Sequence, residues 1–142
     1  MLDFEVGVSP AEFDVTSGGS VVGPIWVRLA GVDFPEPGWP DFPAKLLGGW
    51  LTTLSDLETA APAPAVLHFM EGPYELEVTP AGGPAWLLRA RQDGEPVTES
   101  TADSPAELLA PVRAAASRTL VACRERGWQG PDVRYLSWFT GD

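Results

Sequence analysis

The chain has 142 residues, of which 44% are hydrophobic, and its 20 acidic and 9 basic residues give a formal net charge of −11. This length suits a single domain over residues 1–142, and the hydrophobic content excludes a disordered chain. An acidic protein repels nucleic acid, so we expect no nucleic-acid binding. No apolar stretch reaches the roughly 20 residues of a membrane helix, and the N-terminus lacks the basic residues of a signal peptide. We therefore expect a cytoplasmic protein that does not bind a membrane.

The N-terminal part predicts two β-strands followed by a loop. Residues 2–8 alternate apolar and polar side chains, which is the pattern of a half-buried strand. Residues 25–29 predict a second strand, and Pro24 marks its start or an edge position, because proline cannot donate to a strand ladder. Residues 33–40 contain three prolines and predict an ordered loop that carries two aromatic side chains. Trp39 lies outside any periodic segment, so it is either exposed or folded back on the domain.

A helix is predicted over residues 41–59. Asp41 is a suitable N-cap, and Pro43 is acceptable in a first helical turn. Gly48 and Gly49 each cost such a helix about 1 kcal/mol relative to alanine. We therefore expect either a close approach of the helix to a sheet or a kink at these glycines. The predicted apolar face comprises Phe42, Leu46, Trp50, Leu54 and Leu57.

A meander of strands follows this helix. Residues 66–70 predict a buried or nearly buried strand, residues 74–78 and 86–91 predict a hairpin, and residues 97–101 predict a further strand. A hairpin that is symmetric about Gly83 would place opposite charges across from each other. The two cross-strand pairs expected from this register are Glu77 with Arg89 and Glu75 with Arg91.

A second helix is predicted to begin at Ser104 and to end at Gly127. Ser104, Pro105 and Glu107 have the spacing of a capped helix start, and Pro111 should bend this helix or delay its start. Residues 133–139 predict a last short strand or an aromatic plug. The whole order predicts an α+β fold, with an antiparallel sheet of about five to six strands and two helices packed on one face.

Few residues are suited to catalysis. The one histidine, His68, lies between Leu67 and Phe69 in a predicted strand and is expected to be structural. The one cysteine, Cys123, excludes an internal disulfide, fits a reducing compartment and is expected to pack on a helix face. The sequence shows no zinc, calcium or phosphate-binding motif, so we expect no cofactor and no metal.

Negative charge is concentrated in the first half of the chain. Residues 1–77 contain twelve acidic side chains and only Arg28 and Lys45 as basic ones, whereas residues 78–142 contain eight and seven. Such a surface would attract a basic protein partner, although negative charge also serves solubility alone. We predict a partner-binding site in the loop 33–41 and the turn after Met70. Its candidate residues are Asp33, Glu36, Trp39, Asp41, Glu71 and Tyr74.

Three segments carry a resemblance to a known class of proteins: DFPAKLLGGWLTTL at 41–54, LHFMEGPYELEV at 67–78 and CRERGW at 123–128. They resemble segments of the small acidic immunity proteins of bacterial polymorphic toxin and contact-dependent competition systems. The resemblance implies a single acidic α+β domain that binds and blocks a cognate toxin. From the charge of this chain we expect that toxin to be basic, and we expect the protein to be a monomer or weak homodimer. The resemblance transfers no functional residue. The alternatives are a small enzyme that uses carboxylates or His68, and a structural subunit of a bacterial assembly.

Overall fold

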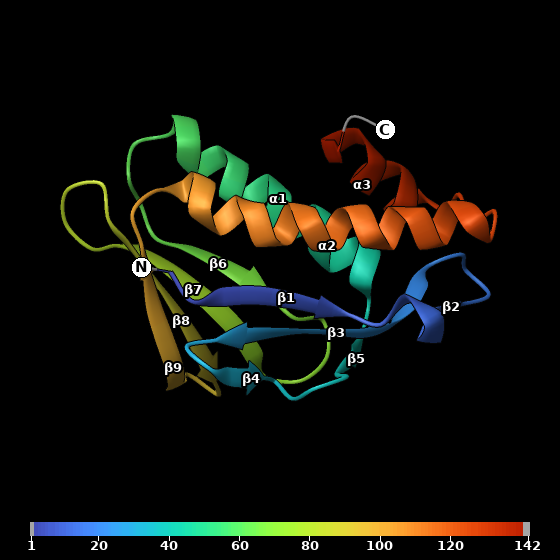
Figure 1. Cartoon of the computed structure of the whole chain (residues 1–142), viewed down its shortest axis with the longest axis horizontal. Helices are drawn as coiled ribbons and strands as arrows, with labels where there is room; N and C mark the ends of the chain where they lie inside the picture. Colours follow the sequence, from blue (N-terminus) through green and yellow to red (C-terminus); the bar gives the residue numbers. More distant parts are fainter. Residues whose placement is uncertain (1, 141–142) are drawn as a thin grey trace.

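The computed structural model describes residues 2–140 and confirms the α+β class. Its strands form two antiparallel sheets of five and four strands, and three helices lie together on one side of them (Figure 1). The sequence predicts one sheet and two helices, so the second sheet and the third helix are differences. No helix in the described part of the chain is long and apolar enough to cross a membrane.

The first sheet is built around one long strand. Its members are β1 (Phe4–Val8), β2 (Asp14–Val15), β3 (Val21–Leu29), β4 (Val32–Phe34) and β5 (Pro40–Asp41), and each of the other four pairs with β3. A short 3-10 helix, η1 (Pro10–Glu12), links β1 to β2. Pro24 marks neither the start of the strand nor an edge position, because β3 begins at Val21 and is the strand with which all others of its sheet pair. Pro24 is accommodated opposite Pro40, where the neighbouring Ile25 N–H supplies the bond to the Trp39 carbonyl oxygen at 2.8 Å.

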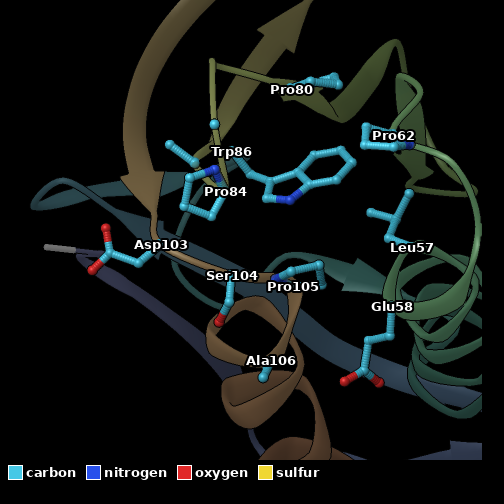
Figure 2. A pocket seen from close by; sticks show the side chains of 12 residues that line it. Leu57, Glu58, Pro62, Pro80, Pro84, Trp86, Asp103, Ser104, Pro105 and Ala106 are labelled. Atoms are coloured by element: carbon cyan, nitrogen blue, oxygen red, sulfur yellow. The ribbon is translucent and has the colours of Figure 1, made fainter.

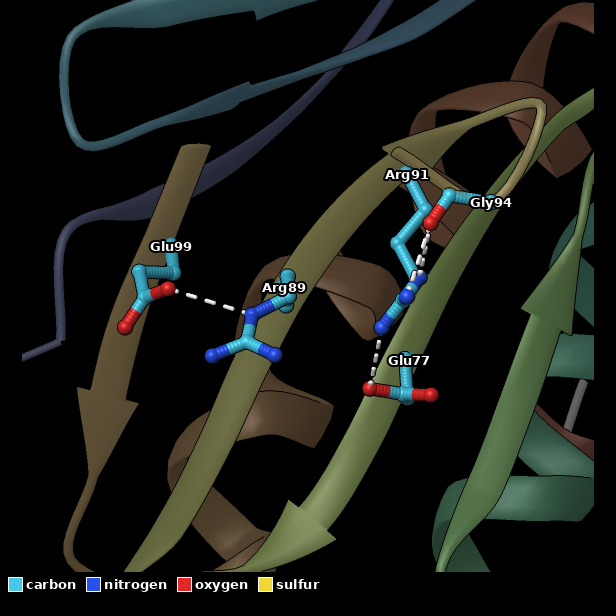
Figure 3. Close-up of polar contacts among 5 residues, drawn as sticks. All are labelled: Glu77, Arg89, Arg91, Gly94 and Glu99. Carbon is cyan, nitrogen blue, oxygen red and sulfur yellow. Dashed lines mark hydrogen bonds and ion pairs between the residues drawn. The ribbon is translucent and has the colours of Figure 1, made fainter. Parts of the chain in front are cut away.

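The second sheet confirms the predicted hairpin. Its strands are β6 (Ala65–His68), β7 (Tyr74–Pro80), β8 (Trp86–Gln92) and β9 (Glu95–Ala102), and they neighbour one another in that order. Both expected cross-strand alignments are present, Glu77 with Arg89 and Glu75 with Arg91. The ion pairs nevertheless run to other partners, since β9 brings Glu99 opposite Arg89. Arg89 pairs with Glu99 and Arg91 pairs with Glu77, each at 3.1 Å (Figure 3).

The predicted strand over residues 66–70 is β6 (Ala65–His68), which ends two residues earlier, and the segment is less buried than predicted. Leu67 and Phe69 are buried, but His68 is exposed and Met70 is 53% exposed. The reason is that successive side chains of a strand point to opposite faces, and only the face that carries Leu67 lies on the core. Apolar side chains on both faces of this segment concealed the alternation.

Side chains, rather than a shared backbone ladder, join the two sheets where β9 meets the first sheet. Thr98 Oγ1 donates a hydrogen bond to the Leu29 carbonyl oxygen at 2.9 Å, and the Asp3 N–H donates to Ser100 Oγ at 3.0 Å. The alternation of apolar residues predicts that a segment is a strand but does not specify its sheet. This is why one sheet was expected where two exist.

The two predicted helices are confirmed as α1 (Pro43–Thr59) and α2 (Pro105–Glu125). Helix α1 begins two residues later than expected, with Phe42 rather than Asp41 in the N-cap position. Helix α2 starts directly at Pro105, so Pro111 does not delay it, and Gly127 follows its end with a positive φ of 70°. Gly48 of α1 is buried and makes a close approach, but to another helix rather than to a sheet.

The aromatic tail is a third helix, α3 (Pro131–Thr140), and not the short strand or plug that was expected. Val133 and Leu136 face the core, as the spacing of one helical turn requires, while Trp138 is 77% exposed. The buried Asp132 accepts hydrogen bonds from the Val21 and Val133 N–H groups, at 2.9 Å each, and thereby attaches the start of α3 to β3. A contact between positions 111 residues apart gives no local signal in the sequence.

Candidate partner-binding site

A hollow of about 510 Å³ lies where β5 leads into α1, and we call it the aromatic hollow. It brings together residues of β3, the end of the β4–β5 loop and the turn after β6. Four of the six predicted site residues lie in it or beside it, namely Trp39, Asp41, Glu71 and Tyr74. The full lining is Val22, Gly23, Trp39, Pro40, Asp41, Phe42 and Glu71.

Asp41 is a buried residue whose hydrogen bonds hold the segments around the hollow together. Its side chain is buried, with 3% exposed, and its two oxygens accept four hydrogen bonds. Oδ1 accepts from the Phe42 N–H at 2.8 Å and the Met70 N–H at 3.3 Å, and Oδ2 accepts from Trp39 Nε1 and the Glu71 N–H at 3.1 Å each. Asp41 is therefore a positioning residue that joins the segment before α1 to the turn after β6. Its charge does not reach a surface where a partner would meet it.

Trp39 is half-buried and packs against its own domain. Its ring meets Tyr74 edge to face, with the ring centroids 5.0 Å apart, while its indole nitrogen is held by Asp41. Tyr74 contacts Phe34 in the same manner at 5.6 Å, so the pair is continuous with the buried aromatic core. Of the two possibilities left open by the sequence, the structure supports folding back with one part of the ring still accessible.

The turn beneath this aromatic pair requires glycine. Gly72 has a φ of +73°, and a Cβ there would lie 2.7 Å from the Tyr74 ring and 3.5 Å from the Trp39 ring. A side chain would thus be strained by the backbone and would displace the ring of Tyr74. Gly72 is a site residue that the sequence analysis passed over as part of a turn.

The remaining candidates differ in their surroundings. Glu36 and Glu71 are exposed, and neither forms an ion pair within the described residues. Asp33 lies on β4 and pairs with Arg28 of the neighbouring β3 at 3.3 Å, outside the aromatic hollow. The charge available beside the hollow therefore comes from Glu71, with Glu36 in the adjoining β4–β5 loop.

The two side chains considered for catalysis lie in unlike environments. His68 is on β6 with 70% of its side chain exposed, and its Nδ1 lies 3.9 Å from Glu75 Oε2. Cys123 is fully buried in α2. Burial raises the pKa of its thiol from the ordinary 9.0 to about 11, the negative charge of Asp132 adds to this shift, and Arg126 opposes it. Such a thiol carries no nucleophilic thiolate at neutral pH.

We expect Cys123 to resist alkylation in the folded protein. Iodoacetamide at pH 8 should leave the native chain unlabelled and should label it fully in urea, as intact mass would show. Rapid native labelling would contradict the assignment.

The raised pKa of Cys123 also predicts how stability depends on pH. The thiol ionises at about pH 9 in the unfolded chain and at about pH 11 in the folded one, so its contribution to stability is complete below pH 9 and is lost as the pH rises towards 11. Urea midpoints of the wild type should therefore fall relative to Cys123→Ala over this range.

Helix α3 carries an exposed aromatic surface that was not predicted from the sequence. Tyr135 and Trp138 are 42% and 77% exposed, and the Trp138 ring lies 5.7 Å from that of Phe139. Pro131 and Asp132 at the start of the segment, with Val133 and Leu136 three residues apart, are the signals that would have indicated an amphipathic helix.

The structure defines an α+β domain with a rigid aromatic pair at an open hollow. No family model matches the chain, and the comparisons with curated proteins and with solved structures found no match either.

Proposed function

We propose that this chain is a non-catalytic immunity or inhibitor protein that neutralises a basic toxin by binding it at the aromatic hollow. The observation that carries the proposal is the preformed pair of Trp39 and Tyr74, held by Asp41 beside the exposed carboxylate of Glu71. Aromatic side chains that are already ordered lose little conformational freedom on binding, which is why they serve as anchors of interfaces.

Charge supports a basic partner. The chain carries a net charge of −11, and long-range attraction would speed its encounter with a basic surface, such as the groove of a nuclease. Within the site, Glu71 and Glu36 retain charges that no ion pair of the described structure neutralises. A toxin bound there should therefore dissociate more readily as ionic strength rises.

The test is a growth assay in bacteria that express the toxin domain encoded by the gene immediately upstream. The wild-type chain should restore growth, and the double variant Glu36→Lys/Glu71→Lys should lose protection, because it reverses both charges beside the hollow. The matched control is Asp56→Lys/Glu125→Lys, which changes the net charge equally at exposed positions of α1 and α2. Trp138→Ala, tested in parallel, reports whether the α3 surface contributes.

Several outcomes would refute the proposal. One such outcome is an upstream gene that encodes no toxin domain. Another is that the Glu36→Lys/Glu71→Lys variant protects growth as well as the wild type does. A third is that the Asp56→Lys/Glu125→Lys control loses protection to the same extent as that variant. Binding measured by calorimetry at low and high salt separates the electrostatic part, since binding that is insensitive to salt would remove the role of charge.

A further inference from the structure

A second cleft, of about 280 Å³, lies at the opposite end of α1 from the aromatic hollow. It is enclosed by the end of α1, the β7–β8 turn and the start of α2 (Figure 2). Helix α1 has 17 residues, so the two sites are separated by roughly 25 Å at 1.5 Å per residue. We call this second site the proline cleft, because Pro62, Pro80, Pro84 and Pro105 line it.

Trp86 is a buried side chain with an unused donor in this cleft. It is 5% exposed, and Figure 2 shows its indole nitrogen on the side that faces Ser104 and Pro105. The comparably buried Trp50 donates its indole N–H to the His68 carbonyl oxygen at 2.9 Å, whereas the N–H of Trp86 has no acceptor among the described residues. The nitrogen is not among the fully buried unpartnered atoms of the described residues, so this N–H opens onto the cleft. An acceptor oxygen of a ligand in the cleft would meet the N–H there.

The walls of the cleft offer few donors that would compete with Trp86 for such an acceptor. The four prolines have no backbone N–H, and each has a fixed φ that restricts the local backbone. Leu57 and Ala85 supply further apolar surface. Pre-formed, mostly apolar walls with few polar groups are typical of ligand sites.

Charge at the rim decides what kind of ligand fits. Glu58 and Asp103 line the cleft, both are exposed, and no ion pair within the described structure neutralises either. The start of α2 would by itself favour an anion, but Glu107 lies in its first turn and accepts a hydrogen bond from the Asp103 N–H at 3.1 Å. Three carboxylates around one helix terminus, with no basic residue in the lining, favour a cation.

We propose that the proline cleft binds an extended peptide segment that carries lysine or arginine. A main-chain carbonyl oxygen of the segment accepts the hydrogen bond of Trp86 Nε1, and the basic side chain pairs with one of the two rim carboxylates, Glu58 or Asp103, which lie on opposite sides of the start of α2 (Figure 2). Both features are met by one residue of a basic polypeptide, since its carbonyl and its long side chain extend in different directions. This site is separate from the aromatic hollow and does not depend on toxin inhibition.

The indole N–H signals of the ¹⁵N-labelled full-length protein test the proposal directly. The probe is the capped tripeptide acetyl-Gly-Arg-Gly-amide, with the glutamine and glutamate tripeptides as matched controls, and Trp86→Phe assigns the Trp86 signal. At millimolar peptide, the Trp86 signal should move saturably with the arginine peptide and far less with the controls. The Trp50 signal should stay in place, because its N–H is already bonded. No movement, or equal movement with glutamine, would overturn the proposal.

Two charge variants complete the test. Glu58→Gln/Asp103→Asn should weaken binding of the arginine peptide by roughly fivefold, which is the size expected of exposed ion pairs. The control Asp56→Asn/Asp93→Asn removes the same charge at exposed positions outside the cleft and should bind as the wild type does. Equal affinity of both variants would contradict the role assigned to Glu58 and Asp103. Unchanged positions of the remaining indole signals in each variant would show that its fold is preserved.

Discussion

Asp41→Ala should destabilise the protein by about 3 kcal/mol or more, the largest effect that we expect of any single substitution. The change leaves four donors without their acceptor, three backbone N–H groups and the Trp39 indole N–H. Hydrogen bonds to a charged group contribute about 1.5 to 3 kcal/mol each, and buried donors left unpaired cost further free energy. Urea unfolding gives the loss. Asp41→Asn should be intermediate, because one oxygen remains and the new amide faces two donors.

The control for this prediction is Asp33→Asn. Asp33 is a partly exposed carboxylate with a single ion pair to Arg28, and such pairs contribute about 1 kcal/mol or less. Both substitutions remove one negative charge, so a general effect of net charge would appear equally in the two. If Asp41→Asn were no more destabilising than Asp33→Asn, Asp41 would not organise the aromatic hollow.

Alanine at the two adjacent glycines of α1 should have opposite effects on stability. A Cβ on Gly48 would lie 2.7 Å from Cδ2 of Tyr135 in α3, whereas a Cβ on Gly49 has no neighbour within 4 Å. Gly49→Ala should stabilise the protein by up to about 1 kcal/mol through helix propensity. Gly48→Ala should destabilise it by about 1 kcal/mol, since the clash of about 1 to 3 kcal/mol outweighs the same gain. Urea unfolding at constant temperature measures both.

Tyr135→Ala shows whether the clash is the cause. The Tyr135 hydroxyl contacts Thr52 Oγ1, and its ring lies 5.2 Å from that of Phe139, so moving the ring aside would disturb both contacts. In the Tyr135→Ala background, Gly48→Ala should become stabilising, as Gly49→Ala is in the wild type. The difference between the two backgrounds is the coupling free energy of the pair. A coupling near zero would mean that α3 does not require glycine at position 48.

The candidate site was partly predictable. Trp39, Asp41, Glu71 and Tyr74 were chosen from two separate segments, and the structure places them together. The role of Asp41 was not predictable, because a helix N-cap and a buried acceptor for a distant turn look alike in the sequence. Glu58, Trp86 and Asp103 of the proline cleft were not recognised either, since they come from three segments that only the packing of α1, β8 and α2 brings together.

The sequence by itself determined the α+β class, the two longer helices and the hairpin centred on Gly83. These follow from periodicity, capping residues and turn residues, all of which act between neighbours in the chain. The tertiary structure decided the division into two sheets, the helical tail and the contacts of Gly48, Asp41 and Asp132. Each of these depends on residues far apart in sequence, whose meeting is set by the burial of a shared core and leaves no local pattern.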